Sequence, residues 1–75
     1  STLGIGIKVF ERMQEVQTLT EQSRYGEAMA AVESLLAQSK LNNYEKAQTL
    51  SLKGNIYFHQ DDLTRARETF ETALA

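Results

Sequence analysis

Apolar residues recur at three- and four-residue steps in four stretches of this 75-residue chain, and no other feature constrains the fold as much. Such steps place side chains on one face of an α-helix. No proline interrupts the chain, which is filled with residues of high helix propensity, such as alanine, leucine, glutamate and glutamine. The sequence therefore predicts an all-α fold of about four helices.

Three short breaks separate the expected helices: residues 23–26, 41–45 and 60–62. Because the breaks are short, sequential helices are expected to pack antiparallel, as helical hairpins. We expect one domain over residues 1–75, with a first hairpin at about 7–40 and a second at about 43–75. The residues expected to be buried are, helix by helix, Val9, Phe10, Met13, Val16 and Leu19 or Thr20; Tyr25, Ala28, Met29, Val32, Leu35 and Leu36; Tyr44, Ala47, Leu50, Gly54, Ile56 and Tyr57; and Leu63, Ala66, Phe70, Ala73 and Leu74.

Polar residues at the breaks suit helix starts. Ser23 is the expected N-cap of the second helix. Asn42, with Glu45 three residues later, has the form of a capping box for the third helix. Asp61 and Asp62 suit the positive end of the fourth helix. Adjacent aspartates could also bind a metal, but no further carboxylate cluster completes an oxygen cage, so we interpret them as caps.

The second half of the chain carries a family signature. A set of its residues resembles the tetratricopeptide-repeat (TPR) pattern, residue by residue: Leu50, Gly54, Tyr57, Leu63, Ala66, Phe70 and Ala73. The resemblance implies a right-handed α-solenoid fragment of about two TPR units. The distance from Tyr25 to Leu63 is 38 residues, longer than the usual period of ~34. Asp61 stands where a turn glycine is frequent, and the proline common at the end of the repeat's second helix is missing.

Packing explains this spacing. Gly54 and Ala66 are small, so the helices of the second hairpin are expected to approach closely where they cross. Tyr57 and Phe70 are expected to fill the space between that hairpin and its neighbour.

TPR proteins bind extended peptides or partner helices in a groove lined by the first helix of each hairpin. The resemblance therefore implies a protein-interaction scaffold or adaptor. The groove positions of the third helix are Gln48, Ser51, Asn55, Phe58 and His59. Phe58 is the most informative, because an exposed aromatic residue has no packing reason to be there. The alternative is that these are solvated positions on an amphipathic helix.

Some TPR proteins bind chaperones, through a basic clamp for a terminal carboxylate. The matching places here hold Met13, Gln17, Ser51 and Leu52, none of which fits such a clamp. Only Asn55 fits, so we exclude that activity.

The sequence contains no recognisable motif of catalytic residues. His59 is the only histidine, and there is no cysteine. Ser23 and Ser51 have no base in a recognisable motif, so nucleophilic catalysis has no support. We therefore expect no enzyme activity, no cofactor and no metal site. Eight basic and ten acidic residues give a net charge of −2, too balanced to indicate a nucleic-acid surface.

Self-association is the alternative function. The last hairpin of a helical array has an apolar flank that a polar capping helix normally covers. A second copy could cover it here, through a face that includes Tyr57, Phe70, Ala73 and Leu74. The apolar start of the chain could equally dock on a neighbour or swap into one; its residues are Leu3, Ile5, Ile7, Val9 and Phe10.

The cellular setting rests on one short stretch. The opening helix and the segment Leu41–Ala47 resemble bacterial TPR proteins that accompany TonB-type energy-transduction systems. This similarity favours the periplasm, while the absence of cysteine is compatible with the cytoplasm too. No apolar run approaches the ~20 residues of a membrane span, so no membrane insertion is expected. The chain starts without methionine and stops inside a helical pattern, so we expect a piece of a longer protein.

Overall fold

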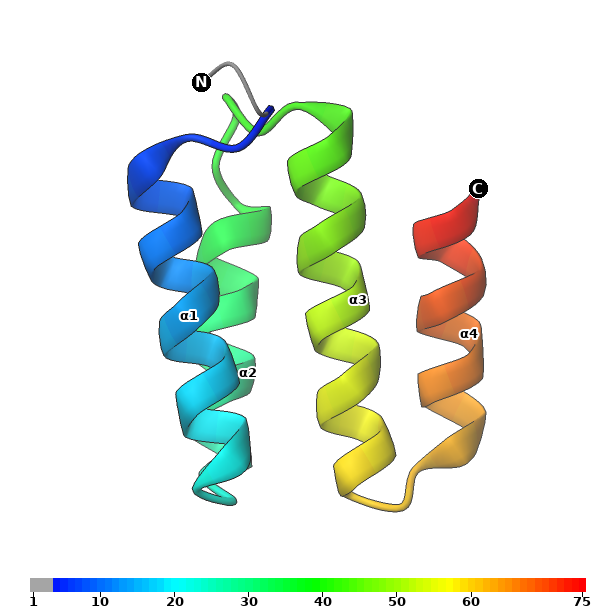
Figure 1. Cartoon of the computed structure of the whole chain (residues 1–75). Helices are drawn as coiled ribbons and strands as arrows, with labels where there is room; N and C mark the ends of the chain where they lie inside the picture. Colours follow the sequence, from blue (N-terminus) through cyan, green and yellow to red (C-terminus); the bar gives the residue numbers. More distant parts are fainter. Residues whose placement is uncertain (1–3) are drawn as a thin grey trace.

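The computed structural model describes residues 4–75 and contains four α-helices (Figure 1). In chain order they are α1 (Ile7–Glu21), α2 (Tyr25–Leu36), α3 (Asn43–His59) and α4 (Leu63–Leu74). Residues 4–75 contain no strand. Consecutive helices run antiparallel, with α2 behind α1 and α4 at the edge of the molecule. The predicted all-α fold of helical hairpins is confirmed. Helix α1 begins at Ile7, after the two glycines, and Leu3 lies outside the described residues.

The turns of the two hairpins follow the same backbone path. Ser23 after α1 and Asp61 after α3 both have φ of 60°. The next backbone N–H, of Arg24 or Asp62, donates to the carbonyl five residues earlier, at 2.8 or 2.9 Å. This pairing is the Schellman arrangement, which satisfies the last carbonyls of a helix. The second helix of each hairpin follows at once and has 12 residues, and this turn and second helix recur after 38 positions, from Tyr25 to Leu63.

The predicted caps are partly right. Asn42 and Glu45 form the expected capping box at the start of α3. Asp62 is the N-cap of α4, because its Oδ1 accepts the backbone N–H of Arg65 at 3.1 Å. The prediction that Ser23 caps α2 is wrong: Arg24 is the N-cap, without a side-chain cap bond, and Ser23 closes the turn after α1. Asp61 closes the equivalent turn after α3, so it does not cap α4.

The core lies between α1, α2 and α3. Five buried side chains form it: Val16, Ala28, Ala31, Val32 and Ile56. Helix α3 packs on two sides, because α4 covers one face while α1 and α2 cover another. On the second face, Glu45 and Thr49 are buried and Tyr44 is 53% exposed, which corrects the predicted seam of this helix. Thr49 satisfies its hydroxyl by donating to the Glu45 carbonyl at 2.8 Å, so a polar residue is tolerated there.

Helix α4 packs on α3 alone among the described helices. Ala66 is its one buried residue, whereas Leu63 is 59% and Leu74 is 88% exposed. The prediction that both leucines are buried is therefore wrong, because no second helix among the described residues covers α4. Phe70 packs on Gly54 inside the second hairpin, not against the first hairpin as expected. Gly54 and Ala66 are both buried, and the close approach of α4 to α3 at Gly54 is made by Phe70.

Glu45 ties the segment before α1 to the start of α3. Its Oε1 accepts the N–H of Asn42 and its Oε2 accepts the N–H of Gly6, both at 2.9 Å. The Asn42 side-chain amide donates to the Gly4 carbonyl at 2.8 Å. Gly4 has φ of 81°, a conformation that favours glycine. The segment 4–6 is therefore held within the chain, whereas the sequence suggested that it could dock on a neighbour.

These bonds predict a specific pH dependence of stability. The N–H groups of Gly6 and Asn42 hold the pKa of Glu45 below its ordinary value of 4.5. A carboxyl with a lowered folded-state pKa stabilises the fold fully above its unfolded pKa, and this stabilisation is lost as the pH falls through the folded pKa. We therefore expect the melting temperature to decrease as the pH is lowered past about 4.5. The decrease should be less steep in Glu45→Gln than in the parent chain.

Thermal melts between neutral and acidic pH, followed by circular dichroism, measure this effect. Glu11→Gln is the matched control, because exposed Glu11 makes no hydrogen bond with the described residues. Equal acid sensitivity of the parent and Glu45→Gln would contradict the role given to Glu45.

Candidate functional site

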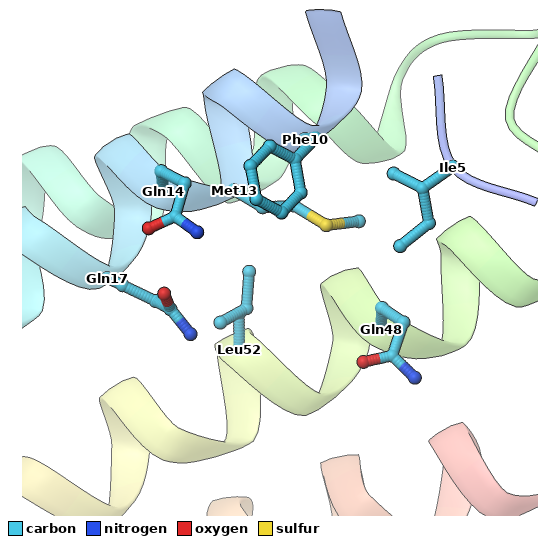
Figure 2. Close-up of a pocket in the computed structure, with 7 residues that line it drawn as sticks. All are labelled: Ile5, Phe10, Met13, Gln14, Gln17, Gln48 and Leu52. Carbon is cyan, nitrogen blue, oxygen red and sulfur yellow. The ribbon is translucent and has the colours of Figure 1, made fainter. Parts of the chain in front are cut away.

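A hollow lies between α1 and α3 (Figure 2). Its volume is about 160 Å³. The residues that line it are Ile5, Phe10, Met13, Gln14, Gln17, Gln48 and Leu52. Figure 2 shows Phe10 beside Met13 on α1, Leu52 on the facing side of α3 and Ile5 at one end. The hollow therefore has apolar walls contributed by the first helix of each hairpin.

Helical spacing explains how these side chains meet. Met13 and Gln14 follow Phe10 by three and four residues, and Gln17 follows them by four and three, so all four share one face of α1. Gln48 and Leu52 are one turn apart on α3. Met13 is 8% exposed and closes the bottom, whereas Phe10 is 50% exposed and stands at the opening. The tied segment 4–6 holds Ile5 in place as the end wall.

The polar groups of the hollow are three glutamine amides. Gln14 and Gln17 come from α1, and Gln48 comes from α3. None of the three donates or accepts a side-chain hydrogen bond with another described residue. Each amide is both a donor and an acceptor, so together they can bond the N–H and C=O groups of an extended chain. None of the residues that line the hollow is charged.

The structure brings only one of the predicted groove residues into this hollow. Gln48 lines it, whereas the other four lie elsewhere on α3. Ser51 is half-buried, and its hydroxyl donates to the Ala47 carbonyl at 3.1 Å. Asn55 is exposed two turns after Gln48 on the same face of α3. Phe58 is 56% exposed, as the sequence led us to expect.

His59 lies at the junction of the two hairpins. Its ring stacks on Tyr25 of α2 with ring centroids 6.3 Å apart, and Phe58 meets it edge-on at 6.2 Å. His59 is nevertheless exposed at the end of α3, as expected if it is a solvated position on an amphipathic helix. These contacts assign it a packing role between hairpins.

Sequence reasoning missed the α1 side of the hollow. The predicted burial of Met13 is confirmed, whereas that of Phe10 is wrong, because half of its surface is exposed at the hollow. Gln14 and Gln17 are not among the groove residues that the sequence predicts. An aromatic residue beside glutamines on the first helix could have indicated this side of the site. The resemblance to the TPR pattern is weak in this part of the chain, so the predicted groove residues all lie on α3.

The predicted self-association residues lie on the second hairpin without forming a closed pocket. Phe70 and Ala73 are half-buried against α3, and Leu74 is almost fully exposed. Tyr57 is half-buried on α3. A hollow of about 350 Å³ lies between the first half of α3 and the end of α4, and its lining includes Leu50 and Ala73.

The chain was compared with protein-family models, curated proteins and solved structures. None of the three comparisons finds a match. Within residues 4–75, no helix is long and apolar enough to cross a membrane. The same residues hold no group of three or more histidine, cysteine, aspartate or glutamate side chains that could bind a metal.

Proposed function

We propose that this chain is a TPR-type protein-interaction module that binds an extended peptide or a partner helix between α1 and α3. The hollow is the observation that carries the proposal. It combines apolar walls from Phe10, Met13 and Leu52 with three glutamine amides. Apolar pockets with a few placed polar groups are the usual form of a binding site.

The recurrence of the same hairpin turn supports the proposal that the chain is of the TPR type. Two hairpins with the same turn, 38 residues apart, place α1 and α3 side by side as first helices. The resemblance implies that first helices line the groove, and the hollow lies between them. Asn55 and Phe58 extend the same surface towards the end of α3, and a ligand longer than the hollow would reach them. The role as a bacterial adaptor beside TonB systems stays a prediction from sequence.

A phage-displayed library of random peptides tests the proposal. Selected peptides are expected to carry an apolar residue for the hollow. Their binding should weaken about tenfold or more in Phe10→Ala and in the double variant Gln17→Ala with Gln48→Ala, because burial and hydrogen bonds are lost. Isothermal titration calorimetry with a selected synthetic peptide measures the change.

Thr64→Ala is the matched control, because Thr64 is exposed on α4 and away from the hollow. Circular dichroism confirms that each variant is folded. Asn55→Ala and Phe58→Ala then show how far along α3 the ligand extends. Peptides that bind the hollow variants as tightly as the parent chain would overturn the proposed site.

A further inference from the structure

The outer stripe of α4 corresponds to a stripe of α2 that is covered in this chain. On α2, Tyr25 stacks on His59 and Glu33 pairs with Lys53 of α3 at 3.1 Å, while Met29 and Leu36 pack against the core. Adding 38 positions gives the corresponding residues of α4: Leu63, Arg67, Glu71 and Leu74. No described helix covers this second stripe, and both of its leucines are more than half exposed.

The order of charges along α4 is unusual for an isolated helix. Arg65 and Arg67 come first along the helix, and Glu68 and Glu71 follow them. The helix dipole favours the opposite order, with acidic residues near the start and basic residues near the end. Asp62 pairs with Arg65 at 2.8 Å, but Arg67 and Glu71 make no ion pair with any described residue. The charges of Arg67 and Glu71 therefore remain available to a partner.

We propose that α4 pairs with α4 of a second copy of this chain, in an antiparallel two-fold arrangement. Leu63, Arg67 and Leu74 of the outer stripe, together with half-buried Phe70 beside it, have steps of four, three and four residues, which are the same in both directions. An antiparallel partner therefore sets Leu63 opposite Leu74 of the other copy, and Arg67 opposite Phe70 and close to Glu71. The pairing joins apolar ends to apolar ends and a guanidinium to an aromatic face and a carboxylate.

The charges reject the other arrangements of two copies. A parallel pair would set each residue of the stripe opposite itself, with Arg67 against Arg67 and Glu71 against Glu71. Head-to-tail stacking would place α1 of the next copy on α4, as α3 lies on α2. The place of Lys53 would then be taken by Glu15, facing Glu71, and the place of Leu52 by Gln14. Like charges across an interface oppose binding, so the antiparallel pair is favoured.

This inference specifies the self-association alternative and concerns a different surface from the hollow, so each proposal can fail without the other. A single 12-residue helix offers a small interface, and small interfaces accompany weak, reversible association. We therefore expect a concentration-dependent monomer–dimer equilibrium.

Charge reversal in trans is the test. In Arg67→Glu, positions 67 and 71 are both acidic. In Glu71→Arg, both positions are basic. Each variant alone should self-associate about tenfold or more weakly than the parent chain, because its like charges face each other. An equal mixture of the two should form a heterodimer, since each acidic position then meets a basic one.

Sedimentation velocity over a concentration series measures the masses, and circular dichroism verifies the helix content of each variant. Lys8→Glu, a charge reversal on exposed α1, is the control and should leave the dimer unchanged. The proposal is overturned if the parent chain stays monomeric throughout, if its mass grows beyond a dimer, or if the mixture associates no better than its components.

Discussion

Ile56→Ala is expected to lower the free energy of unfolding by about 2–5 kcal/mol, the range for removing a large aliphatic side chain from a packed core. Ile56 is 0% exposed and is the α3 member of the cluster between α1, α2 and α3. Domains of this size have roughly 4–11 kcal/mol of total stability at typical values per residue. The substitution would therefore unfold a large share of the molecules near body temperature.

Ile7→Ala is the matched control for this prediction. Ile7 is 78% exposed at the start of α1, so the same change of side chain removes little buried area. Urea titrations followed by circular dichroism give both unfolding free energies. If the two alanine variants lost equal stability, the cluster around Ile56 would not be the core of the domain.

Gly54→Ala is expected to loosen α4 while α1, α2 and α3 keep their packing. A Cβ at Gly54 would lie 2.6–2.9 Å from three ring atoms of Phe70, which is closer than real Cβ contacts allow. Overpacking of this kind costs about 1–3 kcal/mol. The cost falls on α4 because this helix contacts only α3 among the described helices. Hydrogen exchange should therefore accelerate in α4 much more than in α2.

Gly26→Ala is the contrasting variant. Gly26 is exposed inside α2, and a Cβ there would meet nothing within 4 Å. Alanine has the higher helix propensity, so this change should stabilise the chain by up to about 1 kcal/mol.

The double variant Gly54→Ala with Phe70→Ala should lose less stability than the sum of its single changes, because the clash is absent. Additive losses would show that the Phe70 ring is not what Gly54 accommodates.

The two proposals assign different surfaces to one small domain. Peptide binding is proposed for the hollow between the first helices α1 and α3, and self-association for the outer stripe of α4. The surfaces lie on different sides of α3, so a dimer through α4 leaves the hollow open. A dimer of this kind would present two hollows, and a ligand with two binding segments would gain apparent affinity.

The sequence alone determined the local features of this protein. Helix number, the approximate helix boundaries and the capping box of Asn42 and Glu45 follow from apolar spacing and polar residues within a few positions of each other. The exposure of Phe58 and the close crossing at Gly54 were predicted for the same reason, since each depends on neighbours along one or two helices.

Only the tertiary structure decided which helix faces are covered. Periodicity shows that α4 has an apolar face, but the absence of a second covering helix, and hence the exposure of Leu63 and Leu74, appears only in the packed chain. The bond from Gly6 to Glu45 joins residues 39 positions apart, and the hollow needs Phe10 and Gln48 from separate hairpins. Such contacts depend on how the hairpins dock, and helical spacing records only which side chains share a face.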